Sequence, residues 1–145
     1  MTHYFGIKED NKDYRSRRGV YGIFRDGETF GFVSVRDMHF LVGGGIEGNE
    51  DQVTALKREF REEIGYDIQV KACLGEFVEY HYASKINENL KLMNYIYEVE
   101  LLNKVQIPSE DDHTLVWLKA NDVIDTLVLE CQKSVIKDYK EYTSK

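Results

Sequence analysis

The stretch that most constrains this chain runs from Gly43 to Tyr66 and reads GGGIEGNEDQVTALKREFREEIGY. Three consecutive glycines open it, and glycine allows backbone angles and close approaches that side chains forbid. A highly charged segment follows and ends at Gly65, a residue typical of helix C-termini. We therefore predict a glycine-rich loop that leads directly into a helix.

The predicted helix runs from about Glu50 to Ile64. Asn49 is a favoured N-cap residue, and Gln52 stands three positions later, as in a capping box. Apolar residues then recur at spacings of three, four and four, which places them on one face. This face is expected to pack against a sheet and comprises Val53, Leu56, Phe60 and Ile64.

A second face of the helix carries Glu59, Glu62 and Glu63, at i, i+3 and i+4. Like charges at this spacing destabilise a bare helix by about 0.2–0.5 kcal/mol per pair. A hard cation removes the conflict, because Mg²⁺ prefers oxygen ligands and keeps waters free for substrate phosphates. Arg58 and Arg61 flank the cluster, and either guanidinium can brace a carboxylate. The alternative is a solvated acidic helix without a ligand, which three glutamates alone would favour.

The spacing of the whole stretch resembles the Nudix box of the Nudix hydrolase family (MutT-like). Gly44 is followed after five residues by Glu50, and after seven more by the segment 58–66, REFREEIGY. The sequence departs from the family at Phe60 and Tyr66, where aliphatic residues are usual, and at Val42, where a proline often precedes the glycines. The resemblance implies an α/β Nudix fold, an α/β/α sandwich with a central mixed β-sheet.

The resemblance also implies an enzyme that hydrolyses the diphosphate linkage of a nucleoside diphosphate derivative. Its cofactor would be Mg²⁺, with Mn²⁺ as a substitute, and Arg58 would orient a glutamate by a salt bridge. Glu50 would have a structural role near the site. The metal ligands implied by position in the box are Glu59, Glu62 and Glu63, with the carbonyl of Gly44 as a further ligand.

The general base stays open at this point. Family members use either a box glutamate or an acid from a downstream loop. The candidates here are Glu62 or Glu63 inside the box, and Glu110, Asp111 or Asp112 outside it. For the downstream trio, an acidic loop tip without catalytic function is an equal alternative.

Substrate contacts are predicted at two pairs of residues. Arg17 and Arg18 precede the first long strand, where some relatives hold a phosphate, although a solvated strand end explains them equally well. Tyr80 and Tyr82 follow the box at the distance of a base-stacking tyrosine in diadenosine polyphosphate hydrolases. Aromatic rings do stack on bases, but the chain has 10 tyrosines, so cross-strand packing is the simpler interpretation.

Composition limits the remaining functions. The net charge of −7 opposes binding to nucleic acid or an anionic membrane surface. No apolar run is long enough to cross a bilayer, and the polar N-terminal segment does not read as a signal peptide. Cys73 and Cys131 form no metal-ligand pair, and neither His81 nor His113 is needed as a ligand. We therefore expect one cytoplasmic domain, residues 1–145, and the resemblance allows a homodimer.

Strands are expected on both sides of the helix. The Asp26-Gly27 turn predicts a hairpin between strands 20–24 and 29–35. Further strands are predicted at 40–42, 68–82 (with a break at Gly75), 91–102 and 115–118, separated by loops 83–90 and 103–113. Asn121 is expected to cap a helical tail that reaches about residue 142.

Three functions fit these observations. The leading hypothesis is a Mg²⁺-dependent pyrophosphatase for a nucleoside triphosphate, a dinucleoside polyphosphate or a nucleotide sugar. A regulatory module of the same fold that binds a nucleotide with weak turnover is the main alternative, and an acidic interaction domain is the third.

Overall fold

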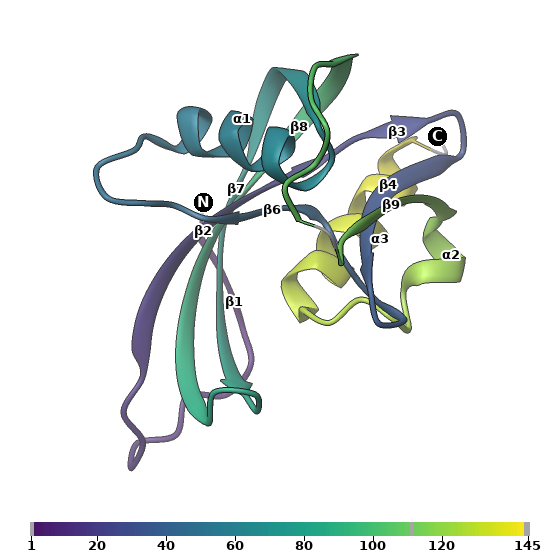
Figure 1. Cartoon of the computed structure of the whole chain (residues 1–145). Coiled ribbons are helices and arrows are strands. Elements are labelled where there is room, and N and C mark those ends of the chain that lie inside the picture. Colours follow the sequence, from purple (N-terminus) through teal and green to yellow (C-terminus); the bar gives the residue numbers. More distant parts are fainter. Residues whose placement is uncertain (1, 111, 144–145) are drawn as a thin grey trace.

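In the computed structural model, two β-sheets and three helices are seen within the described residues, 2–110 and 112–143 (Figure 1). The elements, in chain order, are β1 (Thr2–Phe5), β2 (Arg15–Ile23), β3 (Arg25–Asp26), β4 (Thr29–Val35), β5 (Met38–Phe40), β6 (Val42–Gly45), α1 (Gln52–Glu63), β7 (Tyr66–Ala83), β8 (Glu88–Lys104), β9 (Thr114–Lys119), α2 (Ala120–Val123) and α3 (Glu130–Thr143).

The larger sheet has five strands in the order β1-β7-β8-β2-β6. Two of its pairings are parallel, β1 with β7 and β2 with β8, and the other two are antiparallel. The smaller sheet joins β3, β4, β5 and β9 in antiparallel pairs. The predicted α/β class with a mixed central sheet is therefore confirmed.

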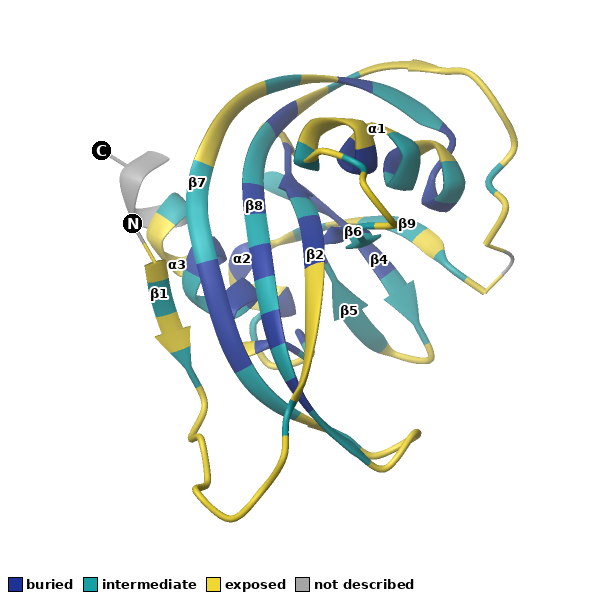
Figure 2. Cartoon of the chain, turned by 90° about the vertical axis from the view of Figure 1, so that its left-hand side faces the viewer, coloured by how far each residue is buried: buried dark blue, intermediate teal, exposed yellow. Residues whose placement is uncertain are grey.

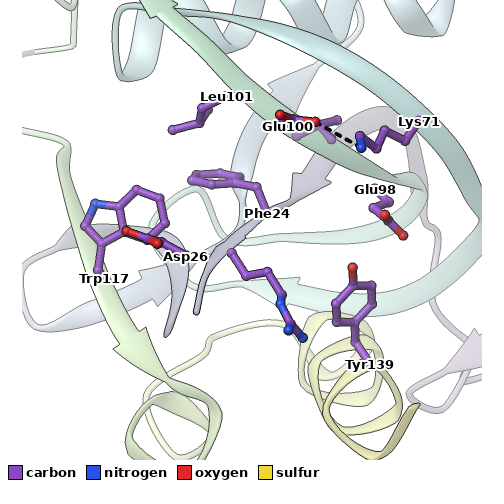
Figure 3. Close-up of a pocket in the computed structure, with 10 residues that line it drawn as sticks. Phe24, Asp26, Lys71, Glu98, Glu100, Leu101, Trp117 and Tyr139 are labelled. Carbon is purple, nitrogen blue, oxygen red and sulfur yellow. Dashed lines mark ion pairs between the residues drawn. The ribbon is translucent and has the colours of Figure 1, made fainter. Parts of the chain in front are cut away.

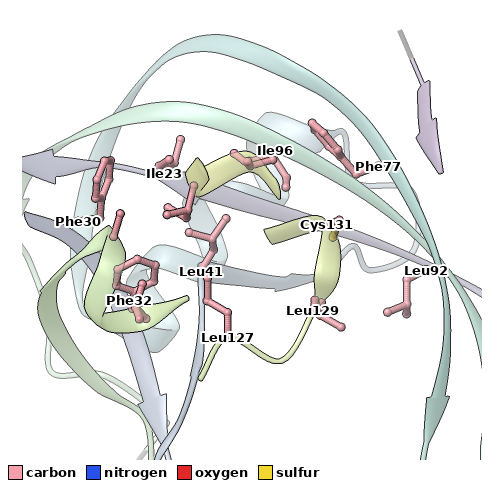
Figure 4. Close-up of a cluster of buried hydrophobic side chains, with 14 of the residues drawn as sticks. Ile23, Phe30, Phe32, Leu41, Phe77, Leu92, Ile96, Leu127, Leu129 and Cys131 are labelled. Atoms are coloured by element: carbon pink, nitrogen blue, oxygen red, sulfur yellow. The ribbon is translucent and has the colours of Figure 1, made fainter. Parts of the chain in front are cut away.

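Each face of the larger sheet is covered by a helix (Figure 2). On the α1 face, the apolar cluster contains Val20, Leu56, Phe60 and Val99. On the α3 face, a second cluster takes residues from β2, β4, β7, β8 and the C-terminal region, among them Ile23, Phe32, Ile96, Leu129 and Cys131 (Figure 4). Alternating side chains along the strands supply both clusters, and the result is the predicted α/β/α sandwich.

Helix α1 starts later than the sequence predicted. Its N-cap is Asp51, whose side chain accepts a hydrogen bond of 2.7 Å from the Thr54 N–H, so the prediction of Asn49 as N-cap is wrong. Glu50 lies in the loop before the N-cap. Its Oε1 accepts a hydrogen bond from the Glu47 N–H at 2.9 Å, which closes a turn over residues 47–50. The helix is therefore shorter at its start than the capping-box pattern suggested.

The apolar stripe and the end of α1 follow the prediction with one exception. Leu56, Phe60 and Ile64 are buried, but Val53 is exposed and Ala55 is buried instead. Gly65 adopts φ 79° and donates to the Phe60 carbonyl at 2.9 Å, which confirms the predicted C-terminal stop.

The hairpin prediction is correct at its turn and wrong in one of its strands. Gly27 has φ 60°, and β3 pairs with β4 across this turn. The strand before it, β2, pairs with β6 and β8 in the other sheet. The chain changes sheets at Phe24, whose ring packs directly over Gly31. A Cβ added at Gly31 would lie 2.0 Å from this ring.

The three glycines form a strand rather than the predicted loop. Gly43, Gly44 and Gly45 belong to β6 and pair with β2. Gly43 has φ 153°, and an added Cβ there would lie 2.1 Å from the Val20 carbonyl oxygen. Side chains are absent here because two backbones approach closely, and the loop proper follows at residues 46–51.

The later elements are longer than predicted. Register shifts around Gly75 confirm the predicted break in β7, and loop 83–90 shrinks to a turn at residues 84–87 between β7 and β8. The tail forms α2 and α3, and the N-cap of α2 is Lys119, so Asn121 lies inside the helix and does not cap it.

Candidate active site

Arg58 is the centre of the acidic cluster on α1. Its Nε and Nη2 bind both oxygens of Glu50 at 2.8 and 2.9 Å, and Nη2 also donates to the Gly45 carbonyl at 2.9 Å. Its Nη1 reaches Glu59 at 3.0 Å and Glu62 at 3.1 Å. One guanidinium therefore ties three carboxylates to β6, and Glu50 has a structural position beside the site.

Glu59 faces the glycine strand. An added Cβ at Gly44 would lie 2.5–2.7 Å from the Glu59 carboxylate, so only glycine leaves room for this side chain. Burial raises the pKa of Glu59, and the nearby Arg58 opposes that shift. The carboxylate is thus held against the backbone of β6.

Glu63 lies in a different environment from its two neighbours on α1. It is 6% exposed, its Oε1 accepts from the Gly43 N–H at 2.7 Å, and its Oε2 lies 2.7 Å from His113 Nδ1. Burial raises the pKa of Glu63 to about 7, although the hydrogen bonds from Gly43 and His113 oppose the shift. On the acidic face of α1, Glu63 is therefore buried, whereas the Glu62 side chain is 37% exposed.

The downstream loop rests on the C-terminal end of α1. Val105 donates to the Gly65 carbonyl at 2.8 Å, and the Ser109 and Glu110 N–H groups donate to the Glu62 carbonyl at 2.8 and 3.3 Å. These bonds bring part of the predicted acidic trio beside the box. Asp111, the middle candidate, lies outside the described residues.

Glu110, Asp112 and His113 gather at the end of this loop. Among the described residues, these three bring one ligand atom each to within 4.8 Å of one another. His113 is the residue that sequence reasoning missed, because its contact with Glu63 spans 50 positions and no local pattern indicates it. Whether an acid of this loop is the base remains a prediction.

The two predicted arginines point to opposite faces of β2. Arg17 lies near Gly45, 3.5 Å from the position of an added Cβ, and lines a pocket of about 450 Å³. Arg18 instead lies over the Tyr95 ring on the other face, 5.9 Å from its centroid. Of the pair, the structure brings only Arg17 to the site.

The two predicted tyrosines also separate. Tyr82 is 53% exposed, lines the same pocket and donates to Asn87 Oδ1 at 2.5 Å. Tyr80 contacts Tyr14 edge-on, with ring centroids 5.3 Å apart, and does not line this pocket. Cross-strand and loop packing therefore accounts for Tyr80.

The pocket, called here the β2–β8 pocket, joins the acidic cluster at Tyr21. This ring lines the pocket and is also close enough to Glu59 and Glu63 for electrostatic interaction, while burial raises the pKa of its hydroxyl. Arg17, His81 and Lys85 supply its basic groups. Its apolar walls are Met38, Phe40, Leu90, Leu92, Val128 and Leu129.

A separate hollow of about 490 Å³ is lined by residues of β3, β7, β8, β9 and α3 (Figure 3). Phe24 and Trp117 form an edge-to-face pair in it, with ring centroids 5.4 Å apart, and Lys71 pairs with Glu100 at 2.9 Å. Its lining mixes three acids with two bases and includes no residue predicted for the site.

The donor set of the acidic cluster fits a divalent cation. Carboxylates and a backbone carbonyl are the oxygen ligands that Mg²⁺ and Mn²⁺ take. The Glu59 carboxylate lies beside the backbone of Gly44, so one ligand of each kind is close at hand. Glu62, with a side chain 37% exposed, is open to solvent. Carboxylates held against a glycine strand, on an α/β/α sandwich, are an arrangement that suits a hydrolase.

Comparison with known families agrees with this class. The model of the NUDIX domain matches residues 13–139, so the chain belongs to the Nudix hydrolase family, and the MutT-like resemblance is confirmed. Members of this family generally use a divalent metal and act on nucleoside diphosphate derivatives. No curated protein matches the sequence.

Solved structures share the fold at low sequence identity. A MutT protein from Methanosarcina mazei is 15% identical with a TM-score of 0.69, covering 92% of this chain and 98% of its own. A NUDIX hydrolase from Nitrosomonas europaea is 13% identical with a TM-score of 0.68, covering 86% and 88%. An ADP-ribose pyrophosphatase from Streptococcus suis is 14% identical with a TM-score of 0.64, covering 89% and 92%. None of the helices within the described residues has the length and apolarity needed to span a membrane.

Proposed function

We propose that this Nudix hydrolase uses Mg²⁺ to cleave the diphosphate linkage of a nucleoside triphosphate, a dinucleoside polyphosphate or a nucleotide sugar. The observation that carries the proposal is the junction at Tyr21. An apolar pocket with Arg17 at its side opens there directly beside the carboxylates of α1. Such a junction suits a ligand with an apolar ring at one end and phosphates at the other.

The carboxylates of the box would hold the metal. Glu59 and Glu62, the Gly44 carbonyl and, once deprotonated, Glu63 form the proposed ligand set. A bound cation would neutralise phosphate oxygens and make a water more nucleophilic. Arg58 keeps Glu59 and Glu62 in place through hydrogen bonds of 3.0 and 3.1 Å, which limits the reorganisation that the reaction requires.

Water activation belongs to a carboxylate with a free oxygen. Both oxygens of Glu63 already take part in contacts of 2.7 Å. Glu62 and the exposed Glu110 are therefore the better bases in this proposal, because each is open to solvent. A base must lie within hydrogen-bond reach of the proton that it accepts.

The test is hydrolysis of a substrate panel with Mg²⁺, with and without a chelator. The panel contains canonical and oxidised nucleoside triphosphates, diadenosine polyphosphates, nucleotide sugars and ADP-ribose. We expect at least one substrate to release phosphate or pyrophosphate, with turnover abolished by the chelator and by Glu62→Gln. Glu28→Gln, an exposed change in the β3–β4 turn, is the matched control.

Two results would contradict the proposal. Turnover that survives both the chelator and Glu62→Gln would remove the metal and the box from the mechanism. Binding of a nucleotide without any turnover would favour the regulatory module instead.

A further inference from the structure

The floor of the β2–β8 pocket carries one neutral polar side chain, that of Asn94. This residue is 2% exposed, lies on β8 and is the register partner of Gly19 on β2. Its Nδ2 donates to Cys131 Sγ at 3.5 Å. Within the described residues, this is the hydrogen bond that the Asn94 side chain makes, so its Oδ1 is left without a donor.

The partner of Asn94 is itself fixed by a buried acid. Glu79 is 3% exposed and accepts from the Cys131 N–H at 2.8 Å and from the Glu130 N–H at 3.2 Å, at the start of α3. The Glu79 side chain also lies close enough to the Cys131 thiol for its charge to raise the pKa of that thiol. Figure 4 shows Cys131 among the apolar residues of this core, close to where α3 begins.

These contacts set the orientation of the Asn94 amide. The amide nitrogen of Asn94 carries the N–H donors, and it is this group that faces the Cys131 sulfur, at 3.5 Å. The sulfur accepts this hydrogen bond. Burial, followed by the charge of Glu79, raises the pKa of Cys131, in keeping with a neutral thiol. The amide oxygen must therefore face away from α3.

The position of Gly19 keeps this oxygen open to the pocket. A Cβ added at Gly19 would lie 3.0 Å from Asn94 Oδ1 and 3.1 Å from Tyr21 Cε2. Without that side chain, the acceptor and the tyrosine ring border the same space. Because Asn94 Oδ1 is not sealed from solvent, water can bond to it, and an N–H group of a bound ligand can replace that water.

We propose that Asn94 determines substrate specificity by accepting a hydrogen bond from an N–H group on the ring of the bound nucleoside. This inference rests on the proposed function, because it takes the β2–β8 pocket as the nucleoside site. The ligand class is a planar heterocycle that fits between apolar walls and presents a ring or exocyclic N–H to the floor. A ring with only acceptors on that edge is excluded.

The test measures binding, separately from turnover. Calorimetry in chelator compares GMP with 1-methyl-GMP, UMP with 3-methyl-UMP, and AMP with N6,N6-dimethyl-AMP, on the full-length protein. We expect at least one parent nucleotide to bind about tenfold more tightly than its methylated form, the size of one lost hydrogen bond. In Asn94→Leu, the ratio of the affinity for the parent nucleotide to that for its methylated form should fall to about one. In Asn94→Asp, which keeps an acceptor, the same ratio should stay above one.

A second variant tests the same acceptor without replacing Asn94. Gly19→Ala places a methyl group against Asn94 Oδ1 and should remove the same discrimination. Cys73→Ala, at the exposed cysteine, is the control and should leave it unchanged. The inference is overturned if no parent nucleotide binds, or if Asn94→Leu and Gly19→Ala both keep the wild-type ratio. Chelator-sensitive turnover of the wild-type protein tests the proposed function separately, so the failure of the one can be distinguished from the failure of the other.

Discussion

The two ends of the candidate site are built in opposite ways. At the acidic end, Arg58 alone contacts three carboxylates and a backbone carbonyl. At the pocket end, apolar walls surround Asn94, whose side chain makes one weak hydrogen bond, to sulfur, within the part of the chain that the structure describes. In the proposed enzyme, redundant charges would hold the reacting groups in place, whereas selectivity would depend on a few polar atoms that are far apart in the sequence.

Removing a carboxylate from the acidic end gives the largest expected effect. Glu62→Gln should lower kcat by about 10²–10³-fold, because preorganised charge at the reacting phosphate is lost. Nucleotide affinity in chelator should stay within about twofold, since Glu62 does not line the pocket. Steady-state kinetics and calorimetry measure the two quantities. A parallel loss of affinity would break the proposed separation of the two ends.

Removing the guanidinium should affect both activity and stability. Arg58→Ala leaves Glu50 and Glu59 without their partner, so the free energy of unfolding should fall by about 1–3 kcal/mol. Arg58→Lys should restore only part of this, because one ammonium cannot reproduce the paired bonds to Glu50. Urea unfolding checks the order wild type, Lys, Ala. Arg61→Ala, which removes an exposed ion pair with Asp67, is the control and should change stability little.

The buried acid predicts a pH dependence for the metal-free protein. Burial raises the pKa of Glu63 to about 7, so between its unfolded value and pH 7 the folded state binds more protons than the unfolded state. Stability should therefore fall as the pH rises from about 4.5 to 7, by at most about 3 kcal/mol. Urea unfolding of wild type and Glu63→Gln in chelator tests this.

The raised pKa of Glu59 contributes in the same direction. Glu63→Gln should therefore weaken the slope rather than abolish it. Added Mg²⁺ should flatten the slope further, because a cation favours the charged carboxylate. A stability that rises over this range in chelator would contradict the burial of Glu63.

At the pocket end, the smallest effect is expected at Tyr82. Tyr82→Phe removes a hydroxyl that is bound to Asn87 in the neighbouring turn. Because the ring remains, KM should change by no more than about threefold and kcat should not change. Steady-state kinetics with the best substrate of the panel measures both. A tenfold rise in KM would instead give the hydroxyl a direct contact with substrate.

The same contrast explains what sequence reasoning could reach. The acidic face was predictable because Glu59, Glu62 and Glu63 are related by local helical spacing. Arg17 and Arg18 could not be distinguished, since which one faces the pocket depends on the pairing of β2 with β8, about 75 positions away. Asn94 carries no local signal at all, because its role comes from Cys131 and Glu79 on other elements.

The misplaced features have a similar cause. The sequence predicts a loop at glycines 43–45, because a strand is recognised by alternating apolar and polar side chains and these residues have none. Asp26-Gly27 correctly predicts a turn, but a turn does not determine how many residues before it pair with β4. The pairing ends at Phe24, because this residue follows β2 and its ring fills the space above Gly31.

Phe24 also has a consequence for how the protein is made. Its ring contacts Phe60, at a centroid distance of 5.5 Å, and Trp117, at 5.4 Å. Phe60 lies on the helix that carries the carboxylates, whereas Trp117 lies on β9, near the end of the chain. During synthesis the acidic helix therefore emerges well before Trp117, the ring that packs on the far side of its neighbour Phe24.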